Sequence, residues 1–415
     1  MSSEGNTKTF AVVHSTHPCT ELVLDVHKIS GYLNKAGYSE VEDPKDADLV
    51  IISTCAFNQH YEKDAVAAIE ETKKTAKEGA QVIVAGCLSK INPELYEETC
   101  DYVPLAPREM HKLEEIIPSP TPLKEIESHT VSIREYEGNR LFMTGIRLKS
   151  FFRKIPFVKV PAWLDTVPMP DWYFIRAATG CAGNCSYCGI KRARGGVRST
   201  PIEMVLSQIT AALSKGYKEI SLAGDDLGCY GIDMGSDLPS LLEEILELPG
   251  DFVTNIRFVE PKWLIEYLDR LMPLFQTGRI TSFCVPIQSG SQRILEAMNR
   301  DYTIEDAVET CNTILRKSKV SSLSSNCMVG FPGETTEDFE LSYRLLQTCD
   351  INMYQVLKYE GRPGTPSEEM ENKVSEEVKE ERRARFTTKM KLVKFAHIPE
   401  FIAEKYSALK HGPLV

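Results

Sequence analysis

The chain has 415 residues, which is more than one ordinary hydrophobic core can organise, so we expect two domains. Its formal net charge of −11 gives a surface that as a whole repels nucleic acids and anionic membranes. No stretch approaches the roughly 18 apolar residues of a membrane span. The start, MSSEGNTKTF, also lacks the basic and apolar regions of a signal peptide, so we expect a cytoplasmic protein without a membrane partner.

The first hundred residues alternate short apolar runs with helical stretches. Runs of this kind predict strands that are buried on both faces of a parallel sheet. The runs lie at Phe10–Ser15, Leu49–Ser53 and Gln81–Ala85, and helical periodicity lies at Glu21–Lys35 and Tyr61–Lys77. This pattern predicts a doubly wound, flavodoxin-like α/β domain over residues 1–103.

A second alternation of strands and helices begins near residue 171, after a weakly patterned segment with clustered prolines at 104–170 that we interpret as a linker. Six βα units over residues 171–368 predict a partial (β/α)6 TIM-like barrel, whose active site lies at the carboxyl ends of the strands. The strands are expected at Tyr173–Ala177, Glu219–Ala223, Asn255–Val259, Ser282–Ile287, Ser324–Val329 and Met353–Lys358. Residues 369–415 are expected to form a charged helical tail.

Three cysteines, Cys181, Cys185 and Cys188, lie on one loop directly after the first barrel strand. A total of twelve cysteines in a chain expected in the reducing cytosol favours metal or redox chemistry over disulfides. Three thiolates on one tight loop are typical of Fe–S sites, and they leave one iron of a [4Fe–4S] cluster open. The alternative is a zinc site or three buried cysteines, although no fourth zinc ligand is evident close by.

A second set of cysteines is scattered along the first domain. Cys19, Cys55 and Cys87 each follow one of the three predicted strands. Because the carboxyl ends of parallel strands share one edge of an open sheet, where ligand crevices form, these thiols could converge. Three independent buried cysteines, which are common in protein cores, are the alternative.

The cysteine loop and its surroundings resemble the radical SAM methylthiotransferases, where SAM is S-adenosylmethionine. The resemblance covers nearly the whole chain and is carried by the segments Gly180–Ser199, Glu219–Asp226, Pro286–Ser291, Ala297–Arg300, Val329–Thr335, Arg362–Pro366 and Glu376–Arg385. It implies that Cys181, Cys185 and Cys188 hold a [4Fe–4S] cluster whose open iron binds SAM. It also implies an auxiliary [4Fe–4S] cluster on Cys19, Cys55 and Cys87, although His17-Pro18-Cys19-Thr20 departs from the family's usual first-cysteine pattern.

The resemblance further implies which residues contact SAM. Glu260 would accept hydrogen bonds from the ribose hydroxyls, a task suited to a carboxylate. Gly224 and Asp225 would line the methionine moiety, Gln288 would approach the adenosyl group, and Tyr187 would lie next to the adenine. For Glu260 and Gln288, the alternative is a polar residue that merely caps a strand.

The implied reaction is a sulfur transfer that converts an unactivated C–H bond into C–S or C–S–CH3. It uses a 5′-deoxyadenosyl radical, a sulfur held on the auxiliary cluster and an electron from an external flavodoxin- or ferredoxin-type donor. Members of the family usually end in a TRAM β-barrel, which we do not expect before Val415. That absence and the negative net charge favour a small-molecule substrate from a biosynthetic pathway. The alternatives are a tRNA or protein methylthiotransferase and, from another class, a non-catalytic Fe–S scaffold or redox sensor.

Overall fold

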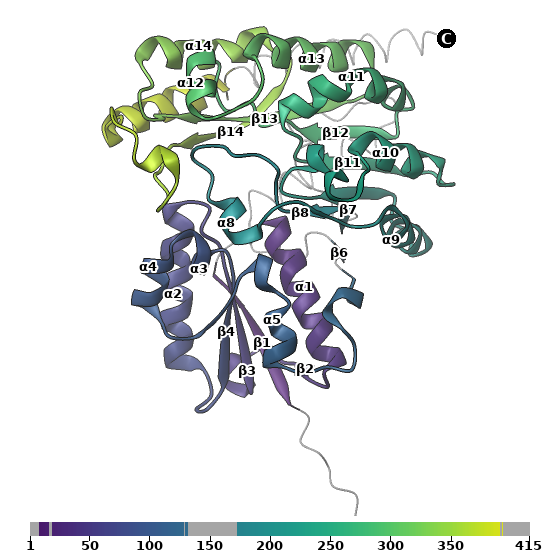
Figure 1. Cartoon of the computed structure of the whole chain (residues 1–415), viewed down its shortest axis with the longest axis vertical. Coiled ribbons are helices and arrows are strands. Elements are labelled where there is room, and N and C mark those ends of the chain that lie inside the picture. Colours follow the sequence, from purple (N-terminus) through teal and green to yellow (C-terminus); the bar gives the residue numbers. More distant parts are fainter. Residues whose placement is uncertain (1–7, 16–18, 128, 132–171, 391, 393–415) are drawn as a thin grey trace, which may run out of the picture.

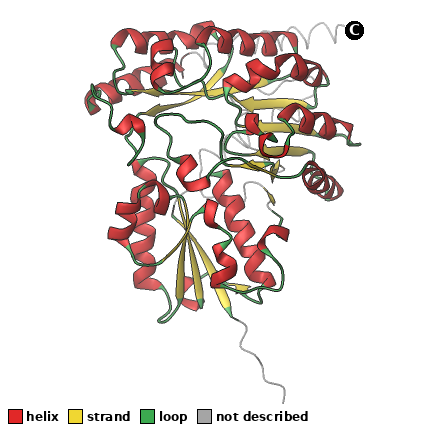
Figure 2. Cartoon of the chain, in the orientation of Figure 1, coloured by secondary structure: helices red, strands yellow, loops and turns green. Residues whose placement is uncertain are grey.

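The computed structural model describes the chain except for residues 1–7, 16–18, 128, 132–171, 391 and 393–415. The described residues form two lobes, an N-terminal α/β domain and a second domain built around a curved sheet (Figure 1). Helices cover both faces of the first sheet and lie along the outer side of the second (Figure 2). Within the described residues, no helix combines the length and apolar character needed to cross a membrane.

The first sheet is entirely parallel and has the order β2-β1-β3-β4-β5. Its strands are β1 (Thr9–His14), β2 (Ser39–Glu40), β3 (Leu49–Thr54), β4 (Gln81–Gly86) and β5 (Val103–Leu105), and its helices are α1 (Thr20–Lys35), α2 (Gln59–Thr75), α3 (Leu88–Ile91), α4 (Pro93–Thr99) and α5 (Lys112–Ile116). Ile51 and Ile52 of β3 pack into separate cores on opposite faces. This order is that of a flavodoxin-like domain, and burial on both faces explains the unbroken apolar run of β3.

The first domain extends beyond residue 103, into the segment expected to be a linker. β5 pairs with β4, and Leu105, Leu113 and Leu123 lie in the same core as Ile29. A three-residue edge strand that contains a proline is too short to show a strand pattern in the sequence. The expected linker therefore differs from the structure over 104–126 and again at 129–131, which form a strand of the second sheet, and its part at 132–170 lies outside the described residues.

The second sheet has the order β14-β13-β12-β11-β10-β7-β6, and only β6 runs antiparallel to its neighbour. Its strands are β6 (His129–Val131), β7 (Trp172–Arg176), β10 (Glu219–Ala223), β11 (Val253–Arg257), β12 (Ile280–Cys284), β13 (Ser322–Val329) and β14 (Asn352–Lys358). The helices are α8 (Ile190–Arg194), α9 (Ile202–Ser214), α10 (Leu238–Glu247), α11 (Pro261–Gln276), α12 (Gln292–Ala297), α13 (Ile304–Lys317) and α14 (Thr336–Thr348). The six predicted strands and the open, partial barrel are confirmed, with shifts of a few residues at the ends.

The described part of the expected C-terminal tail packs onto the second domain. Residues 376–390 are helical, and Phe386 is fully buried in the same core as Phe339. Arg382 is also buried and donates to the Glu334 carboxylate over 2.6 Å. This helix is therefore part of the second domain's core, because its apolar face and one of its cations both have partners there.

Candidate active site at the domain junction

The loop of Cys181, Cys185 and Cys188 is closed by a short antiparallel pair of strands, β8 (Ala178–Thr179) and β9 (Arg198–Ser199). Gly180 starts the loop with a φ of +77°, and a Cβ there would lie 2.1 Å from the Gly196 oxygen. Only glycine fits such a position, because both its backbone conformation and its close approach exclude a side chain.

The three sulfur atoms of this loop face one small space. A Cβ on Gly183 would lie 3.3 Å from the Cys181 sulfur and 3.9 Å from the Cys185 sulfur. Burial, together with the neighbouring Cys185 and Cys181, raises the pKa of Cys188 to about 12. The loop thus collects three thiols without an intervening side chain.

Two buried charged residues lie against this loop. Arg300 places Nη1 3.4 Å from the Cys185 sulfur and Nε 3.3 Å from the Glu260 carboxylate. The other Glu260 oxygen lies 3.7 Å from the position that a Cβ on Gly183 would take. Arg300 belongs to a motif that carries the family resemblance. Nothing in the spacing indicates that it reaches a cysteine 115 residues away.

Asp226 and Cys229 lie next to Cys181. The Asp226 carboxylate accepts hydrogen bonds from the backbone of Gly228 and Glu260 and from the indole of Trp263, at 2.9–3.1 Å. Burial raises the pKa of Asp226 to about 6. The sequence gives Cys229 no ligand spacing, yet its buried thiol donates to the Asp226 carbonyl over 2.9 Å and lies close enough to Cys181 to lower the pKa of Cys181. Asp226 thereby fixes the backbone of Glu260 beside the cysteine loop.

Inside the barrel, two buried amide side chains have acceptors without hydrogen-bond partners among the described residues. They are Oε1 of Gln288 and Oδ1 of Asn326. The two residues are neighbours, since the Gln288 N–H donates to the Asn326 carbonyl over 3.1 Å. Buried polar groups are nearly always satisfied in native proteins, so two adjacent unsatisfied acceptors fit a ligand that donates hydrogen bonds here, as the amino and hydroxyl groups of SAM can.

The other residues expected to contact SAM have different surroundings. Asp225 accepts the Gly180 N–H over 2.7 Å and forms an ion pair with Arg194 Nε at 3.2 Å. Gly224 is tightly packed, since a Cβ there would lie 2.7 Å from Leu227. Asp225 therefore holds the cysteine loop in place, and its contact with the methionine moiety stays a prediction.

Cys19, Cys55 and Cys87 lie together at the carboxyl edge of the first sheet. The Cys55 thiol hydrogen-bonds Cys19 and lowers the pKa of Cys19 to about 7, and Cys87 is close enough to raise the pKa of Cys55. Gly86 permits this arrangement with a φ of +118°. A Cβ there would lie 2.1 Å from the Thr54 oxygen, which accepts the Cys87 N–H over 3.1 Å.

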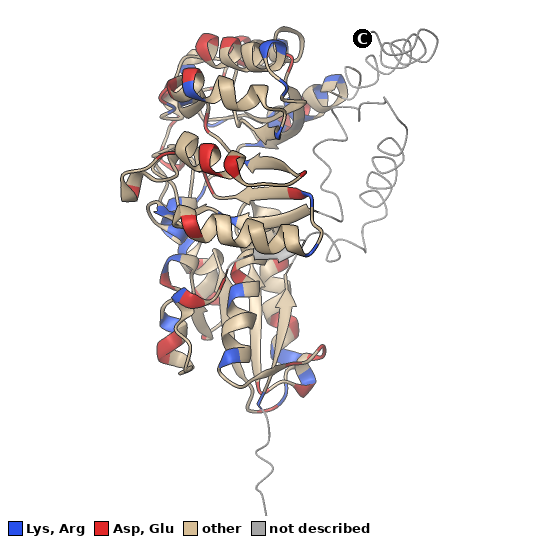
Figure 3. Cartoon of the chain, turned by 90° about the vertical axis from the view of Figure 1, so that its right-hand side faces the viewer, with Lys and Arg blue, Asp and Glu red and all other residues tan. Residues whose placement is uncertain are grey.

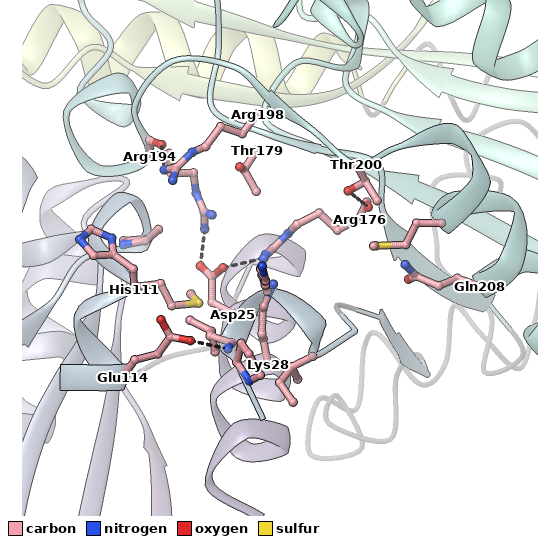
Figure 4. Close-up of a pocket in the computed structure, with 17 residues that line it drawn as sticks. Asp25, Lys28, His111, Glu114, Arg176, Thr179, Arg194, Arg198, Thr200 and Gln208 are labelled. Carbon is pink, nitrogen blue, oxygen red and sulfur yellow. Dashed lines mark hydrogen bonds and ion pairs between the residues drawn. The ribbon is translucent and has the colours of Figure 1, made fainter. Parts of the chain in front are cut away.

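A buried network of ion pairs joins α1 to the second domain, and Figure 4 shows Asp25 between Arg194 and Arg176. Asp25 on α1 binds Arg194 Nη2 at 3.0 Å and Arg176 Nη1 at 2.8 Å. Arg176 also binds Glu21 at 3.1 Å, and burial raises the pKa of Glu21 to about 7. The network forms one wall of a cavity of about 600 Å³. It ties α1, which begins after Cys19, to α8, which begins after Cys188.

The donor sets fit iron–sulfur clusters better than single metal ions. The described residues contain no three His, Cys, Asp or Glu side chains arranged around one ion. A structural zinc ion needs four such ligands around it, whereas the ligands of a [4Fe–4S] cluster bind separate irons and stand farther apart. Two groups of three thiols match the soft donor set of two [4Fe–4S] clusters, and the assignment of these six cysteines as the ligands stays a prediction.

Comparisons with known proteins identify the family. Residues 175–346 match the radical SAM superfamily, and residues 11–105 match a family described as uncharacterized protein family UPF0004. A probable threonylcarbamoyladenosine tRNA methylthiotransferase from Methanocaldococcus jannaschii is 31% identical over 354 residues, which cover 85% of this chain and 76% of that protein. This chain belongs to the radical SAM methylthiotransferase family.

Further relatives of this methylthiotransferase are similar over most of their lengths. The probable threonylcarbamoyladenosine tRNA methylthiotransferase of Pyrococcus abyssi is 28% identical, over 95% of this chain and 87% of that protein. The tRNA-2-methylthio-N(6)-dimethylallyladenosine synthase of Caldicellulosiruptor saccharolyticus is 29% identical, over 91% and 77%. The predicted family and its enzyme class, a transferase that inserts sulfur, are confirmed, as is the use of SAM and [4Fe–4S] clusters.

A solved structure supports the fold of this methylthiotransferase. The radical S-adenosylmethionine methyltransferase TsrM from Kitasatospora setae aligns with a TM-score of 0.59, at 16% identity, over 87% of this chain and 77% of that one. At that identity the likeness extends to the fold alone. It agrees with the predicted α/β architecture of a parallel-sheet domain followed by a partial barrel.

Proposed function

We propose that this chain is a tRNA methylthiotransferase that converts a C–H bond of a modified adenosine into C–S–CH3, with the methyl group taken from a second SAM molecule. The observation that carries the reaction type is the pair of three-cysteine sites, which are joined across the domain junction by the Arg194–Asp25 ion pair. The named relatives act on tRNA. They support an RNA substrate over the small molecule expected from the net charge, and they weigh against a non-catalytic scaffold.

The two cysteine sites would have separate roles. In this proposal Cys181, Cys185 and Cys188 hold the cluster that binds SAM, and Cys19, Cys55 and Cys87 hold the auxiliary cluster that carries the sulfur. When bound, the first cluster and SAM supply a radical that removes a hydrogen atom from an unactivated carbon. The chain itself has to hold the substrate carbon between the two sites and to keep water away from it.

Several buried residues would hold SAM beside the first cluster. Glu260 keeps one oxygen facing the cysteine loop and would accept hydrogen bonds from the ribose. Gln288 and Asn326 have unsatisfied acceptors suited to the adenosyl group. Arg300 would donate to the Cys185 sulfur and orient Glu260 at the same time. We also propose Tyr187 beside the adenine and Gly224 and Asp225 beside the methionine moiety.

A local basic segment offsets the negative net charge at the domain junction. Helix α8 carries Lys191 and Arg192, and Arg198 follows on β9. Figure 3 shows a group of basic residues, in blue, at this junction on the side where α8 lies. Contacts to phosphates depend on the local arrangement of Lys and Arg more than on the total charge, so this segment supports an approach of RNA to the site.

The remaining assignments follow from the same proposal. The first domain, extended to residue 126, would carry the auxiliary cluster, and the barrel together with helix 376–390 would carry the SAM site. An external flavodoxin- or ferredoxin-type protein would supply the electron. A tRNA substrate also fits the cytoplasmic location expected from the sequence.

The test uses the complete chain after anaerobic reconstitution of its clusters. The enzyme is incubated with a reductant, SAM and tRNA that contains N6-threonylcarbamoyladenosine or N6-dimethylallyladenosine. The tRNA is then digested and analysed by mass spectrometry. We expect a methylthiolated nucleoside together with 5′-deoxyadenosine. If 5′-deoxyadenosine forms without any change in the tRNA, the result would favour a small-molecule substrate. If both clusters are intact and no 5′-deoxyadenosine forms, the scaffold reading gains support.

A further inference from the structure

An exposed group of aromatic rings lies next to the auxiliary cysteine site. Phe57 follows Cys55 by two residues in the loop before α2, and 47% of its surface is exposed. Its ring lies 6.3 Å from the ring of Tyr61, which lies 5.8 Å from the ring of His60. Every other phenylalanine and tryptophan in the described part of the chain is buried or half-buried. The Phe57 ring is therefore accessible to a partner from solvent.

The aromatic group lies close to the proposed sulfur-carrying site. The backbone N–H of Phe57 hydrogen-bonds the Cys55 sulfur. Burial raises the pKa of Tyr61, and the neighbouring Cys55 and Cys19 thiols raise it further, so Tyr61 is near both. The rings therefore lie where a substrate atom must arrive if it is to meet sulfur held on these cysteines.

The same loop also contacts the second domain. The backbone N–H of Gln59 donates to the Glu360 carboxylate over 2.7 Å. Glu360 binds Arg362, whose other nitrogen binds Glu62 of α2 at 2.8 Å. Glu360 and Arg362 follow β14, so this contact lies at the carboxyl ends of the barrel strands. Figure 1 shows the start of α2 facing the segment after β14. Phe57 thus lies next to the interface between the two cysteine-bearing domains.

We propose that Phe57, supported by Tyr61, is a stacking surface for the purine ring of the target adenosine. This inference rests on the proposed tRNA function, and it adds the residues that hold the base. A flat, apolar ring next to the sulfur site is suited to the flat face of a purine, because every base offers a π face to an aromatic side chain. Loss of one such contact typically weakens binding by about 5- to 150-fold.

The test compares substitutions of Phe57 in the anaerobic, cluster-loaded enzyme. Phe57→Ala removes the ring, Phe57→Leu keeps an apolar side chain without a π face, and Phe57→Trp keeps a flat ring. All three leave the N–H bond to Cys55 intact, because the backbone makes it. Leu341→Ala is the matched control, since Leu341 is 42% exposed on α14. The readouts are the affinity for tRNA that contains the modified adenosine, KM, kcat and iron content.

We expect Phe57→Ala and Phe57→Leu to weaken RNA affinity and raise KM by about 5- to 150-fold, with iron content unchanged. Phe57→Trp and Leu341→Ala should stay within about twofold of the wild type. Wild-type affinity and KM in Phe57→Ala, or in Phe57→Leu alone, would overturn the stacking role while leaving the tRNA function in place. A wild-type enzyme that neither binds nor modifies the RNA would overturn the proposed function itself.

Discussion

Arg194 donates to Asp25 over 3.0 Å, and each of these side chains is only 3% exposed. Asp25 lies on α1, which begins after Cys19, and Arg194 ends α8, which begins after Cys188. Asp25 also binds Arg176, so one carboxylate serves two buried guanidinium groups. The two cysteine sites are therefore held relative to each other by charges that water does not screen.

Removal of the Asp25 charge should destabilise the protein strongly. Asp25→Asn leaves two buried guanidinium groups short of a counter-charge, which typically costs about 3–5 kcal/mol. We expect a matching drop in the denaturant midpoint of the cluster-loaded chain. Asp251→Asn is the control, because Asp251 and its partner Lys218 are 93% and 66% exposed, and its effect should stay within about 0.5 kcal/mol. Equal midpoints for the two variants would contradict the role given to the network.

The iron content should divide between the two cysteine sites. The reconstituted wild type should hold about eight irons per chain, since each [4Fe–4S] cluster contributes four. A Cys181→Ala, Cys185→Ala, Cys188→Ala variant should hold about four, and so should a Cys19→Ala, Cys55→Ala, Cys87→Ala variant. Iron and sulfide analysis measures this directly. The control is Cys311→Ala, which removes a buried cysteine outside both sites and should leave the count unchanged. Wild-type iron in either triple variant would refute that site.

Neutralising Glu260 should weaken SAM binding without removing the cluster. Glu260→Gln replaces a charged acceptor for the ribose hydroxyls with a neutral one. Hydrogen bonds to charged groups contribute about 1.5–3 kcal/mol, so the dissociation constant for SAM should rise by about 10- to 150-fold. Equilibrium dialysis under anaerobic conditions measures the affinity, and an unchanged iron content verifies the cluster. Glu296→Gln, an exposed change on α12, serves as the control. Unaltered SAM affinity in Glu260→Gln would remove Glu260 from the SAM site.

The buried pair of Arg382 and Glu334 should anchor the C-terminal helix. Arg382→Met leaves the Glu334 carboxylate buried without its cation, which should cost about 3–5 kcal/mol. We expect lower thermal stability and faster proteolytic cleavage within helix 376–390. Arg383→Met is the matched control, since Arg383 pairs with Glu380 in solvent, at 45% and 49% exposure. Equal cleavage rates for the two variants would show that the helix does not depend on this pair.

Features that depend on nearby residues could be predicted from the sequence. The loop of Cys181, Cys185 and Cys188 is one, because its ligand spacing is local. The apolar run of β3 is another, because burial on both faces leaves a continuous pattern. The short edge strand β5 was not predictable, since three residues with a proline carry no strand pattern. The same holds for Cys229, whose contact with Cys181 has no counterpart in the spacing.

The sequence by itself determined the fold class, the family and the three-thiol loop typical of an iron–sulfur cluster. Only the tertiary structure decided which charges surround the site. Arg300 contacts Cys185, which is 115 residues away in the sequence, and Arg194 contacts Asp25, which is 169 residues away. Arg194 also binds Asp225, which the family resemblance assigns to the SAM site. Such pairs leave no periodic signal, because they join residues far apart in the sequence, within the second domain for Arg300 and Cys185 and between the two domains for Arg194 and Asp25. The position of the two cysteine sites relative to each other therefore depends on long-range packing, whereas the grouping of Cys181, Cys185 and Cys188 on one loop depends only on their spacing in the sequence.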